Sequence, residues 1–214
     1  MAIAPDADHH EELARQLVTD LTQPERGVLP RGKICVEARF GAAFQALLVG
    51  DGWSADEPWT PLSRDLSKPV DDCGLRVAVI GPEEAPVCTA VHRSAFGSAK
   101  FIDERWHAMA SGPAYADARC LVGYDGQGRA VATTTVWSAG PGKPGLLEPV
   151  GVHQDHRGHG YGKAISVAAA AALRELGSSS AIVCTPSANV GAVAAYVSAG
   201  FRAHPEVRDR CRDT

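Results

Sequence analysis

The sequence predicts an α/β fold, because segments with the two-residue period of strands alternate with segments that have the helical period. From residue 75 onward the expected order is a strand, two helices, three strands, a helix, a strand, a helix and a last strand. Glycine and proline mark most of the boundaries between these segments. With 45% hydrophobic and 21% charged residues, the composition is that of a globular chain with a packed core.

The elements of the C-terminal two thirds follow from local residue patterns. The run LRVAVI at 75–80 is short, apolar and β-branched, and Gly-Pro follows it, which is typical of a strand and its end. Residues 120–124 and 130–137 are rich in Val and Thr and enclose the turn residues DGQG, so they predict a hairpin. The other expected elements are helices at 83–96, 101–109, 163–176 and 190–198, and strands at 146–152, 181–184 and 204–212, the last a polar edge strand.

The strand at 146–152 is interrupted. Pro149 has no amide hydrogen to donate and Gly151 has no side chain, so we expect a β-bulge or the close approach of a ligand here. An interrupted strand of this kind is a place to look for a functional site.

The first 70 residues carry weaker signals, but part of them repeats. Residues 33–53 align with residues 181–201 without a gap, and each segment contains a short strand and an Ala-rich helix. Such a repeat indicates a duplicated half-domain, although short Ala-rich helices also align by chance. The elements expected before residue 70 are helices at 11–21 and 42–49, an extended segment at 34–36 and a proline-containing stretch at 53–69.

Charge and hydropathy exclude several classes of protein. The 21 Lys and Arg residues against 25 Asp and Glu residues give a net charge of −4, and no basic cluster stands out, so we expect no nucleic-acid partner. No apolar run reaches the ~20 residues of a membrane span, and the acidic N-terminus lacks the pattern of a signal peptide. We therefore expect a cytoplasmic protein with no membrane partner.

The six cysteines do not form a recognisable motif. They are scattered, include no Cys-x-x-Cys pair and mostly lie in apolar segments, which predicts reduced, mostly buried thiols. They are Cys35, Cys73, Cys88, Cys120, Cys184 and Cys211.

A glycine-rich loop joins the interrupted strand to the next helix. Residues 157–162 read Arg-Gly-His-Gly-Tyr-Gly and end where unpaired amides and the positive end of a helix dipole meet. Glycines let the backbone approach phosphates closely, so the loop suits a pyrophosphate, and a simple strand-to-helix turn is the alternative. A P-loop is excluded by Arg157 and Ala164, which stand where it needs Gly and Ser or Thr. A dinucleotide fingerprint is excluded because Lys163 stands where it needs Gly.

With these two motifs excluded, the pattern of the loop is Arg-x-x-Gly-x-Gly, where x is any residue. This pattern resembles the pyrophosphate-binding motif of the GCN5-related N-acetyltransferase (GNAT) superfamily. A second region of that family has an Asn that opens a helix bearing a Tyr and ending in Gly-Phe, and this sequence has the same pattern. The expected element order from 75 to about 210 also follows the family's fold. The matching residues are Arg157, Gly160 and Gly162 in the first motif, and Asn189, Tyr196, Gly200 and Phe201 in the second.

The resemblance implies a mixed, mostly antiparallel sheet flanked by helices, in which the strands at 146–152 and 181–184 part and hold coenzyme A between them. Backbone groups of the first strand would bind the pantetheine arm and polarise the thioester carbonyl, and the amides of the loop would hold the pyrophosphate. Acetyl-CoA is the implied co-substrate, and no metal is predicted. The residues implied for coenzyme A are Val150, Gly151, Val152, Arg157, Gly158, His159, Gly160, Tyr161, Gly162, Lys163 and Asn189.

Two side chains are candidates for proton transfer. Tyr196 would donate a proton to the leaving thiolate, as the family's tyrosine does, and its alternative is a half-buried aromatic with a satisfied hydroxyl. Asn189, seven residues earlier and so on nearly the same helix face, also suits a plain N-cap. Glu148 is the candidate base, because it lies just before the carbonyl-binding amides. A solvated carboxylate or an anion that orients the substrate is an equal alternative for Glu148.

Other polar and aromatic residues are weaker candidates. His153, His156 and His159 recur every three residues, but no carboxylate or Cys lies at ligand spacing, so we do not expect zinc, and the imidazoles can assist anion binding. Three carboxylates near the second helix would select a cationic amine or form a solvated face, and two tryptophans would line the acceptor site or pack in the core. These five residues are Asp103, Glu104, Asp117, Trp106 and Trp137.

The N-terminal copy of the repeat lacks the chemistry of the C-terminal copy. Leu48 stands opposite Tyr196, and Gly41 stands opposite Asn189. We therefore expect the N-terminal copy to pack or to shape the acceptor site without binding coenzyme A. The expected domains are a degenerate half-GNAT segment at 1–70 and a GNAT acetyltransferase domain at 71–214.

The predicted function is transfer of the acetyl group of acetyl-CoA to a primary amine by direct attack in a ternary complex. The alternative, from another class, is a non-catalytic acyl-CoA-binding or regulatory module that keeps the loop without turnover. The acceptor is a small-molecule amine or a protein amine, and the sequence specifies neither its identity nor the acyl chain length. The oligomeric state is also open, and a homodimer is one state that the sequence allows.

Overall fold

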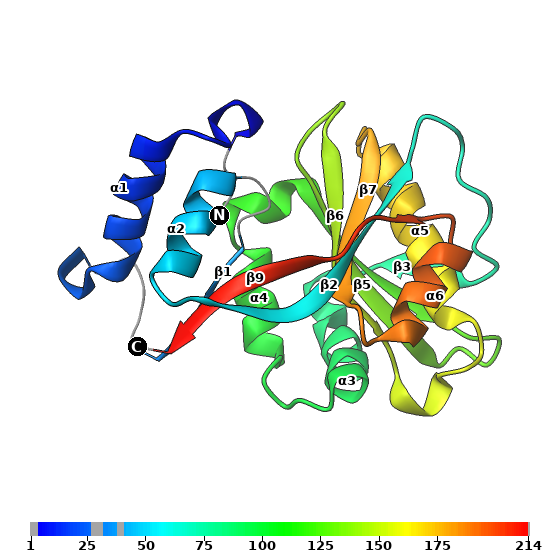
Figure 1. The fold of residues 1–214 in the computed structure, drawn as a ribbon. Coiled ribbons are helices and arrows are strands. Elements are labelled where there is room, and N and C mark those ends of the chain that lie inside the picture. Colours follow the sequence, from blue (N-terminus) through cyan, green and yellow to red (C-terminus); the bar gives the residue numbers. More distant parts are fainter. Residues whose placement is uncertain (1–3, 27–31, 38–40, 214) are drawn as a thin grey trace. The chain divides into compact units, whose positions relative to one another are not determined.

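The computed structural model describes residues 4–26, 32–37 and 41–213 of an α/β chain (Figure 1). Its segments form two compact units that interleave along the sequence. No helix in the described part is long and apolar enough to cross a membrane. Unit 1 consists of Met1–Thr60, Pro186–Ala188 and Pro205–Thr214, and unit 2 consists of Pro61–Thr185 and Asn189–His204.

Unit 2 is built on a mixed, mostly antiparallel sheet, as expected. Strands β3, β4, β5 and β6 pair antiparallel in that order, and β6 pairs parallel with β7. The second half of β2 pairs with the short strand β8. The bounds are β2 Ser54–Asp65, β3 Arg76–Val79, β4 Ala118–Tyr124, β5 Ala130–Ser138, β6 Pro144–Val152, β7 Ser180–Pro186 and β8 Arg202–Ala203.

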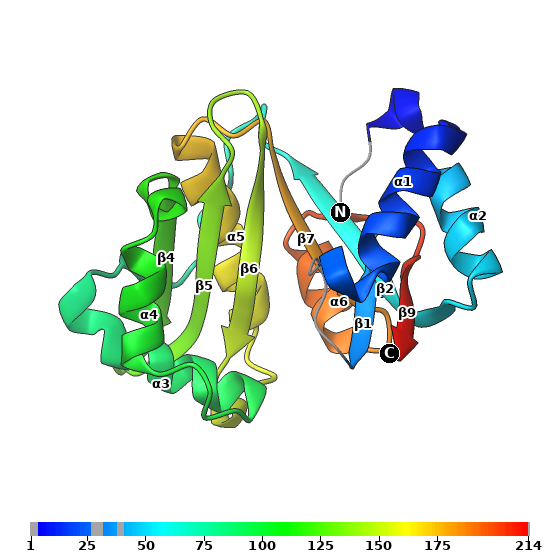
Figure 2. The same cartoon turned by 90° about the vertical axis from the view of Figure 1, so that its left-hand side faces the viewer.

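Helices cover both faces of this sheet, with α5 on one side and α3 and α4 on the other (Figure 2). Alternate residues of β4 supply the two cores, because Leu121 faces the α5 side whereas Cys120 and Val122 pack with Trp106 of α4. The bounds are α3 Ala85–Phe96, α4 Asp103–Ala110, α5 Tyr161–Glu175 and α6 Val190–Ser198, with 3-10 helices η3 Pro82–Glu84, η4 Pro113–Asp117 and η5 Gln154–His156.

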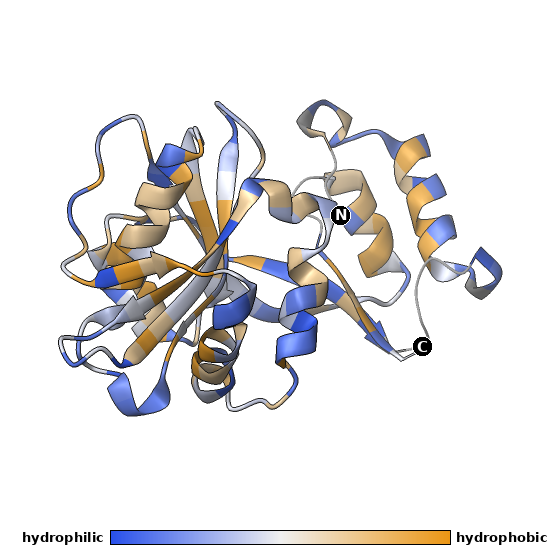
Figure 3. Cartoon of the chain, turned by 180° about the vertical axis from the view of Figure 1, so that it is seen from behind, coloured by the Kyte–Doolittle hydropathy of each residue, from blue (hydrophilic) through white to orange (hydrophobic). Residues whose placement is uncertain are grey.

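Unit 1 contains a small antiparallel sheet in the order β1, β9, β2 and two helices, α1 and α2. Ala14 of α1, Phe44 and Leu48 of α2 and Trp53 form its buried core. Hydrophilic and hydrophobic bands alternate along α1, as an amphipathic helix requires (Figure 3). The bounds are η1 Pro5–Ala7, α1 Glu11–Thr22, η2 Pro24–Arg26, β1 Lys33–Val36, α2 Ala42–Gly50 and β9 Val207–Asp213.

One expectation about strands was wrong, and one strand was not expected. Within the proline-containing stretch at 53–69, to which the sequence assigned no element, Ser54–Asp65 form the long strand β2. The register of β2 against β9 shifts between Ala55 and Pro58, which accommodates a residue without an amide donor. The expected edge strand at 204–212 is β9, which pairs with β1 on one side and β2 on the other. The edge prediction failed and β2 went unrecognised for one reason, since the partner strands come from distant parts of the chain.

The expectation that all six cysteines are reduced was also wrong. Cys35 of β1 and Cys211 of β9 stand directly opposite each other in the sheet and form a disulfide. They are 176 residues apart, so no local pattern indicates their pairing. Cys88 and Cys120 are buried thiols, as expected, with 3.3 Å between their sulfur atoms.

The two segments of the repeat have the same local structure. Helices α2 and α6 begin and end at equivalent positions of the alignment. Each is followed by a left-handed glycine, Gly52 with φ 82° and Gly200 with φ 83°. The next amides, of Trp53 and Phe201, bond back to carbonyls five residues earlier at 3.0 and 3.1 Å. Residues 38–40 lie outside the described part, and the shared ancestry of the segments, with the domain division drawn from it, stays a prediction.

Replacing Leu48 by Ala tests the core of unit 1. Leu48 is fully buried, so we expect the free energy of unfolding to fall by about 2–5 kcal/mol in denaturant titrations. The matched control is Leu47→Ala on the same helix, where the side chain is 37% exposed and the change should stay within about 0.5 kcal/mol. Equal losses for the two variants would contradict this core.

Candidate active site

The two central strands of unit 2 part. The parallel ladder between β6 and β7 ends at the pair Leu146 and Ile182, although the strands continue to Val152 and Pro186. Figure 2 shows the strands diverging. On its other edge β6 stays paired with β5 up to Val152. Beyond this point, the backbone groups on the edge of β6 that faces β7 have no ladder partner. This is the parting of the two strands that the resemblance implied.

A β-bulge lies where the strands part. Glu148 and Pro149 of β6 together stand opposite Thr135 of β5, and the register shifts there. The peptide bond between Glu148 and Pro149 is cis. Trp137 Nε1 donates a hydrogen bond to the Glu148 carbonyl at 2.8 Å, and the Glu148 side chain is exposed. The interruption predicted from Pro149 is thus a bulge, and it turns one backbone carbonyl toward an indole.

Gly151 serves the packing of a helix. A Cβ atom at this position would lie 2.8 Å from Ala95 Cβ and 3.2 Å from Phe96 Cε2, so only glycine lets α3 approach β6 this closely. The side chains of Val150 and Val152 pack against the core on the opposite face of the sheet. The close approach expected at Gly151 is therefore made by α3, and the three residues offer a ligand their backbone groups.

The glycine loop is fastened to the last turn of α3 by two hydrogen bonds. The Arg157 guanidinium donates to the Ala95 carbonyl at 2.6 Å, and the Gln154 amide donates to Ser94 Oγ at 3.1 Å. A cation beside the last carbonyls of a helix also interacts favourably with its dipole. Arg157 thus positions the loop with its side chain. The sequence did not single out Ser94 and Ala95, because only tertiary packing brings them to the loop.

The loop keeps its own amides available. Gly158 and Gly160 have φ values of 79° and 81°, which side-chain-bearing residues rarely adopt. Gly160 opens α5 without a side-chain cap, and the amides of residues 158–163 donate no hydrogen bond within the described part of the chain. A Cβ at Gly162 would lie 3.4 Å from Ala195 Cβ, so this glycine serves the contact of α5 with α6. Unpaired amides at a helix N-terminus form an anion site.

The histidines around the loop make local contacts. His159 Nδ1 donates to the Arg157 carbonyl at 2.8 Å, and its ring stacks on Tyr161 with 5.9 Å between the centroids. His153 Nδ1 accepts the Asp155 amide at 3.3 Å. Among the described residues, the three imidazoles do not converge as metal ligands. The Lys163 side chain is exposed.

Tyr196 lies beside the parted strands. Its side chain is buried, and its ring centroid is 5.9 Å from that of Phe201. Burial, with a smaller electrostatic contribution from Cys184, raises the pKa of Tyr196 to about 12. Cys184 belongs to β7 beyond Ile182, where the ladder to β6 has ended. The tyrosine is therefore protonated at neutral pH and close to the parted stretch of β7.

A model of the acetyltransferase (GNAT) family matches residues 89–201, which is more than half of the chain. The chain belongs to this family. The match includes the glycine loop and the helix of Tyr196. Acyl transfer is therefore the general function that the family supports.

Solved structures of GNAT proteins share the fold over nearly the whole chain. A GCN5-related N-acetyltransferase from Sphaerobacter thermophilus is 18% identical with a TM-score of 0.71, and the alignment covers 98% of this chain and 70% of that one. One from Kribbella flavida is 18% identical with a TM-score of 0.66, covering 100% and 78%. A tandem GNAT protein from the clavulanic acid biosynthesis pathway is 17% identical with a TM-score of 0.61, covering 96% and 67%. A search among curated proteins found no match.

Other predicted site residues of this GNAT chain have structural partners. Asn189 is the N-cap of α6, and its side chain accepts the Ala192 amide at 3.2 Å, so the capping interpretation is confirmed. Asp103 accepts a hydrogen bond from the Thr89 hydroxyl. Trp106 is a core residue, 1% exposed. The exposed carboxylates near α4 are Glu104 and Asp117, and Trp137 is partly buried.

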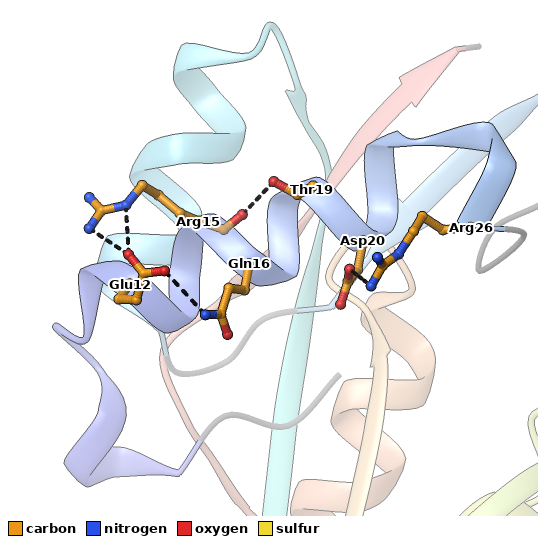
Figure 4. A pocket seen from close by; sticks show the side chains of 6 residues that line it. All are labelled: Glu12, Arg15, Gln16, Thr19, Asp20 and Arg26. Atoms are coloured by element: carbon orange, nitrogen blue, oxygen red, sulfur yellow. Dashed lines mark hydrogen bonds and ion pairs between the residues drawn. The ribbon is translucent and has the colours of Figure 1, made fainter.

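One surface depression lies along α1 and another lies between α1 and α2, and neither contains a residue of the loop or of the parted strands. In the first, Arg15 pairs with Glu12 at 3.0 Å and Arg26 pairs with Asp20 (Figure 4). These exposed charges neutralise one another, which is typical of a solvated helix face. The candidate site of unit 2 is instead defined by the backbone geometry of the loop and of the parted strands.

Replacing Gly151 by Ala tests the contact of α3 with β6. The new methyl group would overlap Ala95 Cβ, so we expect a loss of about 1–3 kcal/mol in the free energy of unfolding. Ala95→Gly removes the opposing methyl group. The double variant should therefore lose less free energy of unfolding than the two single variants lose in sum. Strictly additive losses in this double-mutant cycle would show that the two residues do not touch.

Proposed function

We propose that this protein transfers the acetyl group of acetyl-CoA to a primary amine, by direct attack of the amine on the thioester while both substrates are bound. The observation that carries the proposal is the end of the β6–β7 ladder at Leu146 and Ile182, which leaves backbone groups of β6 unpaired. The loop that follows β6 adds unpaired amides at a helix N-terminus. Membership of the GNAT family supports acyl transfer in general, and the acetyl donor and amine acceptor are our extension.

The backbone of the loop and of β6 fits the two polar parts of coenzyme A. The amides of residues 158–163 bind the pyrophosphate, helped by the positive end of the α5 dipole. Backbone groups of Val150, Gly151 and Val152 bind the amide groups of the pantetheine arm and polarise the thioester carbonyl. Since Arg157 and Gln154 fasten the loop to α3, its amides are positioned before the ligand arrives.

Two side chains transfer protons in the proposed reaction, one as a base and one as an acid. Glu148, exposed at the bulge, accepts a proton from the amine, directly or through a water molecule. The amine nitrogen forms a bond to the acetyl carbon, and the carbon–sulfur bond breaks. Tyr196 donates its hydroxyl proton to the departing thiolate, because its raised pKa of about 12 keeps the phenol protonated until that step. The acceptor is a small-molecule or protein amine.

Replacing Gly160 by Val tests the anion site. A β-branched residue at φ 81° distorts the loop and withdraws amides from the pyrophosphate, so coenzyme A should bind at least about tenfold more weakly in calorimetry. Gly128→Val is a matched control, because Gly128 has φ 78° and equally open surroundings in the turn between β4 and β5. Undetectable binding of coenzyme A to the wild-type protein would refute the proposal.

Replacing Tyr196 by Phe tests the proton donor. Turnover with labelled acetyl-CoA and a panel of amines should fall by about 10²–10⁴-fold, whereas the affinity for coenzyme A should be nearly unchanged. The control is Tyr124→Phe on β4, for which we expect normal turnover. Unchanged turnover in Tyr196→Phe would remove this residue from the mechanism. A wild-type protein that binds acetyl-CoA but acetylates no amine would indicate the non-catalytic module.

A further inference from the structure

Unit 1 carries a second group of reactive side chains, on one face of its small sheet. Cys35 of β1 and Cys211 of β9 are opposite each other, and Asp56 lies on β2, the other neighbour of β9. Cys35 Sγ is 3.6 Å from Asp56 Oδ2, and the ligand atoms of the three residues all lie within 4.8 Å of one another. Among the His, Cys, Asp and Glu residues that the structure describes, this is the one such group.

We propose that reduction of the Cys35–Cys211 disulfide opens a zinc site formed by the two thiolates and the Asp56 carboxylate. Thiolate sulfur and carboxylate oxygen are both common zinc ligands, and a water molecule completes the usual four. Mg²⁺ and Ca²⁺ take oxygen ligands, so the two sulfurs favour zinc over either. All three residues belong to unit 1, and the site is separate from the residues of the proposed acetyl transfer.

The charge on this face favours a cation. Asp209 lies two residues before Cys211 within β9, so the strand period places its carboxylate on the face of the sulfurs. Glu37 directly follows β1, two residues after Cys35. The basic partner of Asp56 is Lys33, whose Nζ is 3.4 Å from the carboxylate and whose side chain is largely exposed. A divalent ion would add positive charge to a face that carries carboxylates.

The reaction that opens the site balances with a dithiol reductant. Its thiolate attacks one sulfur of the disulfide and its second thiol resolves the mixed disulfide, so the reductant leaves as a cyclic disulfide. The Cys35–Cys211 bond breaks, and each sulfur gains an electron and a proton. Zn²⁺ then displaces these two protons as it forms two metal–sulfur bonds. The same two cysteines therefore hold β1 to β9 in both redox states, covalently when oxidised and through the metal when reduced.

Cobalt binding to the full chain tests the site, because Co²⁺ bound to thiolates absorbs through charge transfer. The protein is reduced with a dithiol, desalted without oxygen and titrated with Co²⁺ and then with Zn²⁺. We expect one equivalent of cobalt to give the charge-transfer band, zinc to abolish it, and the oxidised protein to give no band. Cys35→Ser should remove the band, and Cys184→Ser, the matched control, should retain it.

Asp56→Asn provides a variant that keeps the disulfide and so reports on the site without loss of the covalent link. We expect it to bind zinc about tenfold or more weakly than the reduced wild type in competition with a chelating dye. Reduced wild-type protein without a cobalt band, or Cys35→Ser with an undiminished band, would overturn the zinc site. Wild-type affinity in Asp56→Asn would remove the carboxylate from the ligand set and overturn the three-residue site. None of these results bears on acetyl transfer, which does not involve these residues.

Discussion

The parting of β6 from β7 is the constraint on which the proposed active site depends. Backbone amides and carbonyls in a sheet need partners, and a strand that stops pairing leaves them for solvent or for a ligand. Here the ladder stops at Leu146 and Ile182, and the bulge at Glu148 and Pro149 follows at once. Because β6 stays paired with β5, only one edge of it is released. The released edge faces β7, and Tyr196 of α6, whose side chain is buried, interacts electrostatically with Cys184 on that strand.

Helix α3 supports both halves of this arrangement from a single turn. Ala95 and Phe96 pack on Gly151 of β6, and the Ala95 carbonyl and Ser94 hydroxyl hold the glycine loop through Arg157 and a backbone amide. The loop is thus fixed by one side chain and by an amide outside the motif. The amides of residues 158–163 are therefore not needed to hold the loop in place. For this reason the loop can have a defined shape while these donors stay unpaired.

Residues 33–53 have the same local structure as residues 181–201 but different side chains at two equivalent positions. Leu48, which stands where Tyr196 does in the other segment, is fully buried and has no hydroxyl. The start of α2 is also occupied, because Asp8 accepts hydrogen bonds from the Gly41 and Ala42 amides. These bonds hold the pKa of Asp8 below its ordinary value. The carboxylate of Asp8 therefore occupies the N-terminus of α2. At the N-terminus of α5, by contrast, the amides have no such partner.

The sequence by itself determined the features that depend on neighbouring residues. The order of the elements, the bounds of α6, the glycine loop and the interruption at Pro149 all follow from periodicity, propensity and missing donors, which act within a few residues. Tertiary structure decided how distant segments meet: β2 as a strand, β9 between two partners, the Cys35–Cys211 bond and the attachment of Arg157 to α3. Periodicity tells which face of a strand is buried but not which strand lies beside it, because that choice depends on the packing of the whole sheet.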